Sequence, residues 1–200
     1  MLQVVEVTDA VLDAGVLQFL QRRVMVSAAS CSVEHIPSVV RCVGFRVLER
    51  PQRLVVFVRT SETVRLLADL HATRRVAVVF SEPTTHRTLQ VKGDDALPGP
   101  LEHGDWPQVA AHVEAAVAEL APLGYPETWV RKIFESAPNQ VQAIRFTPMS
   151  AFAQTPGPRA GEPLAGAQPR SIRRWNRSAP ASRVTSRVSS QRATPTGHRM

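Results

Sequence analysis

The sequence has 200 residues, of which 44% are hydrophobic and 20% are charged, and its formal net charge is +7. That length is sufficient for one domain with a core and for a tail beside it. The positive charge is concentrated in residues 151–200, which hold nine Arg, no Lys and one acid, whereas residues 1–150 hold fifteen Lys and Arg against sixteen acids. The net charge of these two parts is +8 and −1, so the total does not indicate a basic domain that binds nucleic acid.

The first part of the chain predicts one helix followed by three strands. Apolar residues recur at helical spacing over 9–23, where Thr8 or Asp9 could serve as the N-cap. Short apolar runs predict strands over 23–30 and 37–48. The continuous apolar run 53–58 predicts a strand that is buried on both faces.

The second part predicts helices between further strands. Thr60 or Ser61 could cap a short helix, and strands follow over 75–80 and 86–93. Residues 94–104 are predicted as a loop. Amphipathic helices are expected over 106–120 and from Pro126, before a last strand over 141–148.

This order of elements predicts the fold class. Many short strands with few helices favour a mainly β, α+β fold: a small antiparallel, Greek-key-like barrel with peripheral helices. Neither a GxGxxG motif nor a Walker motif is present, which disfavours a doubly wound nucleotide-binding fold.

The composition divides the chain into two regions. Residues 1–157 are predicted as the folded domain and 158–200 as a disordered tail rich in Arg, Pro and Ser, because its scattered apolar residues cannot form a core. Its arginines could contact nucleic acid or an acidic membrane. A solvated tail is favoured, since Trp175 is its one aromatic residue.

Simple motifs point to a cytoplasmic protein without a metal centre. No apolar run approaches the length of a membrane span, and the acidic N-terminus does not resemble a signal peptide. Cys31 and Cys42 lie in apolar runs without a CxxC motif, which is typical of buried reduced thiols. The six His residues show no ligand spacing, so no metal is predicted.

The strand within residues 81–93 carries the most informative pattern. Because side chains alternate along a strand, one face is predicted to carry His86, Thr88, Gln90 and Lys92. This face offers hydrogen-bond donors and no acid, which suits an electron-rich ligand such as a phosphorylated cofactor. The alternative is an ordinary solvated face of an antiparallel sheet.

Four segments together resemble one protein family. These are residues 37–41, 57–61, 76–80 with 86–93, and 145–148 followed by 152–161. In them the chain resembles the pyridoxamine 5′-phosphate oxidase-like FMN-binding split barrels, and in particular their flavin-nucleotide-binding branch. The resemblance covers about residues 10–161, and the strand, turn and Arg-x-x-x-Val-x-Gly strand ending at Gly93 is its most specific part.

The resemblance implies a homodimer with FMN between two split β-barrels. The family's Ser-Arg-Lys phosphate cluster here reads Val64-Arg65-Leu66, so that Ser61 or Thr63 would replace missing contacts. Thr88 and Gln90 match positions that face the flavin ring. The implied cofactor-binding residues are Arg41, Thr60, Ser61, Thr63, Arg65, Thr88 and Gln90.

Elementary chemistry is compatible with a phosphate near residue 61. A helix N-terminus presents free backbone N–H groups and a partial positive charge, and phosphate is a natural ligand there. Arg41, Arg59 or Arg65 could neutralise that phosphate through bidentate hydrogen bonds.

The expected function is that of an FMN-dependent oxidoreductase acting on an unknown small substrate. The family's Arg-x-His substrate motif is replaced by residues 145–148, so pyridoxine phosphate oxidation is not expected. No catalytic residue is assigned, and His86 is the one candidate proton donor. The alternatives are a non-catalytic flavin-storage protein, or a barrel that binds a deazaflavin or haem, with His86 or His103 as possible haem ligands.

Overall fold

The computed structural model describes residues 11–49 and 52–164, and these ranges contain eight β-strands and four α-helices. The strands are β1 (Met25–Cys31), β2 (Pro37–Glu49), β3 (Gln52–Arg59), β4 (Val76–Ser81), β5 (Thr88–Gly93), β6 (Leu97–Gly99), β7 (Val141–Phe146) and β8 (Ser150–Ala153). The helices are α1 (Ala14–Leu20), α2 (Val64–Thr73), α3 (Asp105–Leu120) and α4 (Glu127–Phe134).

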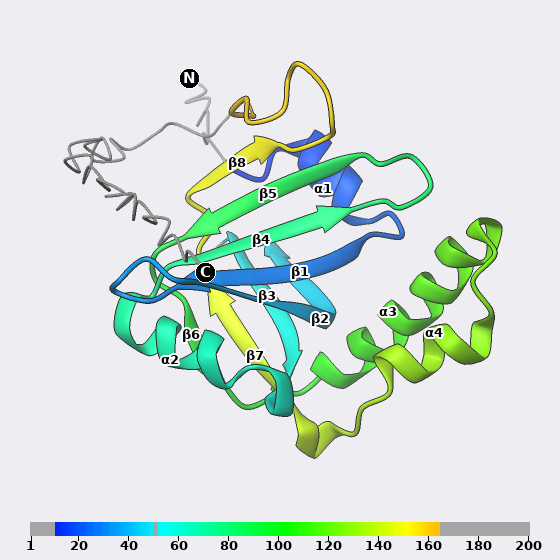
Figure 1. The fold of residues 1–200 in the computed structure, drawn as a ribbon, viewed down its shortest axis with the longest axis horizontal. Helices are drawn as coiled ribbons and strands as arrows, with labels where there is room; N and C mark the ends of the chain where they lie inside the picture. Colours follow the sequence, from blue (N-terminus) through cyan, green and yellow to red (C-terminus); the bar gives the residue numbers. More distant parts are fainter. Residues whose placement is uncertain (1–10, 50–51, 165–200) are drawn as a thin grey trace, which may run out of the picture. The chain divides into compact units, whose positions relative to one another are not determined.

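All eight strands belong to one antiparallel sheet in the order β6-β7-β3-β2-β1-β4-β5-β8 (Figure 1). This arrangement confirms the predicted antiparallel α+β fold with peripheral helices. The two end strands, β6 and β8, do not pair with each other, so the sheet is not closed.

The sheet nevertheless curls around an interior core. An added Cβ on Gly93 of β5 would lie 2.5 Å from Cδ2 of Phe146 and 2.8 Å from the carbonyl oxygen of Thr147. Strands β5 and β7, which are far apart in the sheet order, therefore approach each other closely at their ends. Glycine is required at this position because a side chain would collide with its neighbours.

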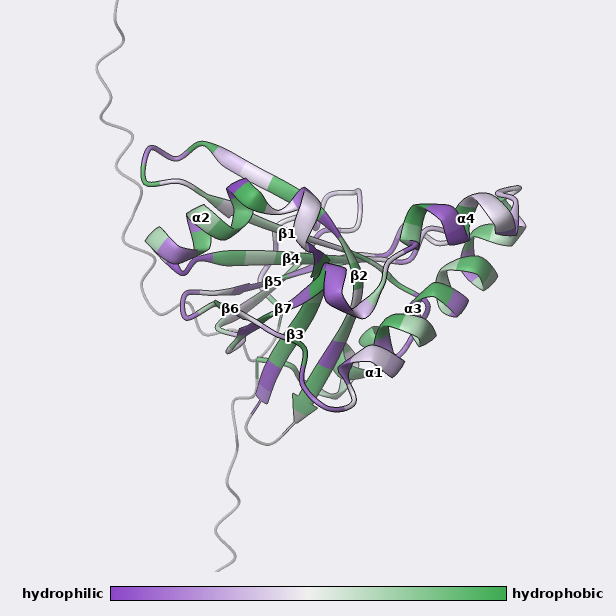
Figure 2. Ribbon diagram, turned by 90° about the horizontal axis from the view of Figure 1, so that it is seen from below, coloured by the Kyte–Doolittle hydropathy of each residue, from purple (hydrophilic) through white to green (hydrophobic). Residues whose placement is uncertain are grey.

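Strand β3 is buried on both faces, as its sequence predicted. Its even-numbered apolar residues pack into the interior core, and the odd-numbered ones pack against a second core beneath α3 and α4. Figure 2 shows β3 coloured as hydrophobic along most of its length. The first set is Leu54, Val56 and Val58, and the second is Val55 and Phe57.

The helices occupy different places around the sheet. Helix α2 contacts β1, β2 and β6, and its Leu66 and Leu70 enter the interior core. Helices α3 and α4 form a pair beside β2 and β3 (Figure 1). Helix α1 is shorter than predicted and begins after Asp13, whose carboxylate accepts a hydrogen bond of 2.8 Å from the Val16 N–H.

Several boundaries differ from the sequence-based expectation. The predicted loop 94–104 contains β6, and β8 follows the last predicted strand. Helix α2 begins at Val64 rather than near Ser61, because residues 60–62 form a 3₁₀ turn first.

Backbone hydrogen bonds to β8 also continue past residue 157, where the folded domain was predicted to end. The Gly161 N–H donates to Ala153 O at 2.7 Å, and the Leu164 N–H donates to Ala151 O at 2.9 Å. These bonds hold the segment against β8. The predicted tail beyond residue 164 lies outside the described residues.

Candidate functional site

The candidate site is the outward face of β1, β2, β4, β5 and β8. Cross-strand pairing places five residues in one row across these strands: Arg41, Ser27, Val79, Gln90 and Phe152. Directly paired residues share a face of a sheet. The intervening residues, such as Ala28, Val78 and Val91, point into the core and are buried.

Small side chains form the middle of this outward face. Ser27 and Ala29 of β1 pair with Val79 and Ala77 of β4, and all four are partly exposed. In Figure 1 the strands β1, β4 and β5 face the viewer with no helix drawn in front of them, while α2 lies on one side and α3 with α4 on the other. The face therefore offers a flat surface on which a planar molecule could bind.

Arg41 lies at one end of the row and is exposed. Its guanidinium carbon lies 5.9 Å from the centre of the Phe134 ring. No acid in the described part of the chain forms an ion pair with Arg41. Its hydrogen-bonding capacity is therefore available to a ligand.

Arg59, the neighbouring candidate, is committed to structural contacts. Its Nη1 donates to the carbonyl oxygen of Ile133 at 2.6 Å, and its Nη2 pairs with Glu62 at 2.7 Å. These contacts tie the end of β3 to the last turn of α4 and to the turn that follows β3. Arg41 is thus the better candidate to bind an anion.

The turn after β3 lies beside the Arg41 end of β2, because Cys42 pairs with Val58 one residue before Arg59. Ser61 is exposed, whereas the Thr60 hydroxyl donates to Gln140 O at 3.2 Å. The Thr63 side chain is fully buried, and its hydroxyl donates to backbone oxygens of Arg59 and Thr60. Thr63 is consequently not presented to a ligand in this conformation, and no side chain caps α2.

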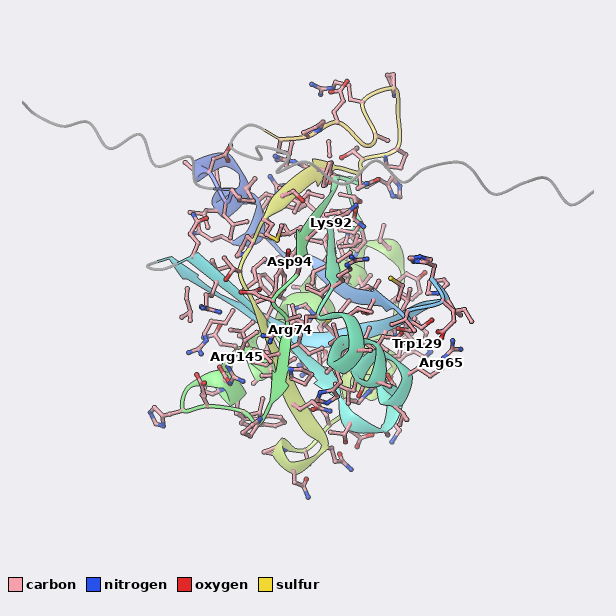
Figure 3. All side chains as sticks on the ribbon, turned by 90° about the vertical axis from the view of Figure 1, so that its left-hand side faces the viewer. Arg65, Arg74, Lys92, Asp94, Trp129 and Arg145 are labelled. Atoms are coloured by element: carbon pink, nitrogen blue, oxygen red, sulfur yellow. The ribbon has the colours of Figure 1, made fainter. Side chains whose placement is uncertain are left out.

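Arg65 extends from the first turn of α2. Figure 3 shows it on the side of the molecule that faces the viewer in Figure 1, which is also the side of the open sheet face. It is exposed, and no described acid forms an ion pair with it. Arg41 and Arg65 are thus two exposed guanidinium groups that no described acid pairs with.

Gln90 lies on β5, three strands away from Arg41, which at ordinary strand spacing corresponds to about 14 Å. Its side chain is half-buried and makes no hydrogen bond within the described chain. The Thr88 hydroxyl lies 2.8 Å from Ser81 Oγ on the neighbouring strand and contacts His86 O. Gln90 therefore has more free hydrogen-bonding capacity than Thr88.

His86 does not continue the predicted row of donors. It precedes β5 and has a φ of +59°, a left-handed conformation found in turns. The prediction that His86 shares a strand face with Gln90 is therefore wrong, because the strand starts two residues later. On the other face of β5, Leu89 and Val91 are buried.

Phe152 completes the row and was not identified from the sequence. It belongs to β8, a strand of four residues that was not predicted. Its backbone is paired with Gln90, and the Lys92 ammonium lies 4.7 Å from the centre of its ring. The alternation Ser150, Ala151, Phe152 is the signal that could have revealed it, although it is very short.

Two cavities contain none of the five residues of this row, although Phe134, which lines the first, also contacts Arg41. One of about 470 Å³ separates α3 from α4 and is lined by Val109, Arg131 and Phe134 among others. The other, of about 310 Å³, is lined by Arg53, Glu102 and Arg145 with apolar residues. Figure 3 shows Arg145 on the opposite side of the molecule from Arg65.

The charges around both cavities are already paired. Arg131 contacts Glu114 and Glu127, each at 2.6 Å. Arg145 pairs with the fully buried Asp105 at 3.2 Å, and Arg46 contacts the same carboxylate at 3.0 Å. The Arg131 contacts join α4 to α3, and the Asp105 contacts join α3 to β2 and β7. Neither cavity therefore replaces the outward face as the candidate site.

The histidines that the structure describes do not gather at one place. No group of three His, Cys, Asp or Glu side chains in residues 11–49 and 52–164 could hold a metal ion. His86 and His103 lie on separate connections, one between β4 and β5 and the other before α3. Burial in α3 lowers the pKa of His112 to about 4, so that this side chain is neutral at pH 7.

None of the helices within the described ranges combines the length and the apolar character that crossing a membrane requires.

Comparison with known proteins identifies similar solved structures only. No protein-family model and no curated protein matches the sequence. A pyridoxamine 5′-phosphate oxidase-related FMN-binding protein from Nostoc punctiforme is 14% identical, with 75% of this chain and 87% of that chain covered and a TM-score of 0.44.

Other similar structures have different cofactors in their names. The haem storage protein HutZ from Vibrio cholerae is 15% identical, with 71% and 94% of the two chains covered and a TM-score of 0.42. An F420 reductase is also 15% identical, with 67% and 93% covered and a TM-score of 0.41. This chain is similar to pyridoxamine 5′-phosphate oxidase-related proteins, as its motifs indicated, but these distant likenesses assign it no cofactor.

Proposed function

We propose that the outward sheet face binds FMN and that the protein is a flavin-dependent oxidoreductase acting on a small substrate. The observation that supports this most is the single row in which Arg41, the small residues Ser27 and Val79, and Gln90 follow one another. This row contains an arginine without an ion pair to a described acid, a flat surface of small side chains, and a glutamine amide without a hydrogen bond in the described chain. A planar molecule with an anionic group needs these three features.

The phosphate of FMN would lie at the Arg41 end. Arg41 and Arg65 can donate charge-assisted hydrogen bonds, and the nearby Ser61 hydroxyl and the amides at the start of α2 add further donors. Each bond to a charged group contributes roughly 1.5–3 kcal/mol. Two arginines can therefore replace the family's complete Ser-Arg-Lys cluster.

The ring of FMN would lie over the small side chains, with its polar edge at β5. The Gln90 amide can both donate and accept a hydrogen bond, and the Thr88 hydroxyl is close to it along the same strand. When bound, the flavin supplies the electron-transfer chemistry, while the protein supplies binding and orientation. Among the described residues of this face there is no Asp, Glu or His to act as an acid or base.

A ligand on an open sheet face requires a cover to exclude water. Four apolar residues around the Arg41 end are strongly exposed: Val33 (63%), Ile36 (52%), Val39 (68%) and Val64 (73%). Exposed apolar groups of this kind mark interaction surfaces. We therefore propose a homodimer in which a second copy packs on these residues and encloses the FMN.

The lack of an acid or base on the face supports a second candidate function. A protein that only binds or stores flavin needs no proton donor. Stopped-flow reduction of the bound flavin by NAD(P)H distinguishes the two, because only the oxidoreductase would show reduction and reoxidation at a useful rate.

Single substitutions on β5 test the proposed face. Gln90→Ala is expected to weaken FMN binding about tenfold, which corresponds to a loss of about 1.4 kcal/mol of binding free energy. Thr88→Ala should weaken it less, because the Thr88 hydroxyl also contacts Ser81. FMN titration measures the affinity, and thermal unfolding checks that the fold is retained. Gln18→Ala, on the exposed side of α1, is the matched control. If both β5 variants bind FMN like the wild type, the assigned face is wrong.

A further inference from the structure

Lys92 forms a second positive end of the outward face, far from Arg41. It lies on β5 two residues after Gln90 and points to the same side, where it is exposed. No acid within the described ranges forms an ion pair with it, including the nearby Asp94 on the following loop (Figure 3). The ammonium group is thus free to bind a ligand.

Neighbouring residues on β8 position this ammonium group. Lys92 pairs directly with Ser150, and Phe152 is its diagonal neighbour. The Nζ atom lies 4.7 Å from the centre of the Phe152 ring, a cation–π contact that favours one position of a flexible side chain. Ser150 is half-buried, and its hydroxyl makes no hydrogen bond within the described chain.

Two separate positive ends can bind two separate anions. Arg41 lies on β2 and Lys92 on β5. Between them, β1 and β4 form an uncharged surface that includes Ala29 and Ala77. FMN carries a single phosphate, and that group cannot reach both ends when the ring lies between them. The second end therefore remains unpaired after FMN has bound.

We infer that Lys92 Nζ and Ser150 Oγ bind the anionic group, a carboxylate or a phosphate, of the molecule that exchanges electrons with the flavin. This inference rests on the proposed function, because it takes the Arg41 end as occupied by FMN. It assigns the substrate to a class: small organic anions that approach the flavin from the β5–β8 edge. Arg41 and Arg65 do not contribute to this subsite.

The lysine content of the chain allows a direct test. Lys92 and Lys132 are its two lysines, and Lys132 is an internal control because it is exposed and pairs with Glu135 at 2.5 Å. Reductive methylation with ¹³C-formaldehyde labels both amines and retains their charge. Lys132→Arg assigns the two NMR signals, and the signal of the terminal amine is common to both samples.

The FMN-loaded, labelled protein is titrated with inorganic phosphate and, separately, with acetate, at constant ionic strength kept with NaCl. The chemical shift of the Lys92 signal is expected to change saturably with at least one anion. The Lys132 signal should shift no more than it does in NaCl alone. Ser150→Ala should weaken this binding about threefold. Comparison of the two anions distinguishes a phosphate site from a carboxylate site.

The outcomes separate this inference from the proposed function. Lys92→Met should leave FMN affinity within about twofold, because Lys92 is not one of the phosphate ligands. If FMN binds and both lysine signals respond alike to every anion, the subsite is absent and the proposed function stands. If FMN does not bind the wild-type protein, the proposed function fails, and the inference fails with it.

Discussion

Arginines of this chain differ in role because of what surrounds each guanidinium group. Arg41 and Arg59 lie near each other on adjacent strands and have equal charge. Arg59 is held by the Ile133 carbonyl and Glu62, whereas Arg41 lies over the Phe134 ring and forms no ion pair with an acid in the described part of the chain. The sequence named both as possible phosphate partners, and the family resemblance favoured Arg41. The structural partners of Arg59 come from segments far along the chain, so local sequence does not reveal them.

This difference predicts different effects of substitution. Arg41→Ala is expected to weaken FMN binding at least tenfold, because a charge-assisted hydrogen bond is lost. Arg59→Ala should change FMN affinity less than threefold, yet lower the unfolding midpoint because its contact with the end of α4 is lost. FMN titration and urea unfolding measure the two effects. Equal losses of FMN affinity would show that Arg41 is not the phosphate ligand.

Alternation along a single strand was a reliable guide to which residues share a face. It placed Thr88, Gln90 and Lys92 on one face, as the structure has them, and the residues between them are buried. It failed at His86, where the backbone leaves the extended conformation. Thr63 likewise resembled an available hydroxyl in the sequence, but the 3₁₀ turn before α2 directs it to backbone oxygens.

Elements with strong local signals were predicted and the short ones were missed. The apolar run of β3 and the periodic pattern of α3 each span several residues, so their type is determined locally. Strands β6 and β8 have three and four residues. Such strands exist only because neighbouring strands β7 and β5 supply hydrogen-bond partners, which local sequence does not reveal.

Helix α3 makes the stability of the fold depend on pH through His112. This side chain packs between Phe45 and Phe134, and burial lowers its pKa from 6.5 to about 4. The unfolded chain therefore binds a proton below pH 6.5 that the folded chain does not bind until about pH 4. Stability from this group is present above pH 6.5 and is lost as the pH falls toward 4.

Between pH 7 and pH 5 the free energy of unfolding is expected to fall by about 2 kcal/mol because of His112. Urea unfolding at the two pH values measures this fall. His112→Leu should remove that part of the pH dependence, whereas His103→Leu, on an exposed loop, should retain it. An unchanged pH dependence in the His112 variant would contradict the account of its burial.

The arrangement of the whole sheet brings the site together from distant segments. The row from Arg41 to Phe152 spans five strands, and their order in the sheet differs from their order in the chain. Family motifs indicated the barrel, but the position of Phe152 and the close approach of Gly93 to Phe146 depend on how the sheet curls. No local pattern contains that information.

For the molecule as a whole, the exposed side chains of Val33, Val39 and Val64 predict a dimer. Light scattering of the wild-type protein is expected to give twice the chain's mass of 22.0 kDa. Val39→Glu places a charge at the centre of the proposed interface and should shift the protein to a monomer with weaker FMN binding. A charge at Leu97, which is exposed on β6 away from the valines, is the control. A monomeric wild-type protein would contradict this part of the proposal.

The absorbance spectrum of the purified protein, recorded before and after addition of FMN and removal of the unbound flavin, tests the central claim most directly. The account predicts flavin absorbance bands that stay with the protein, together with a higher unfolding temperature, because a bound ligand stabilises the folded state. A colourless protein that neither retains added FMN nor gains thermal stability would contradict it, and a Soret band in the untreated protein would indicate haem instead.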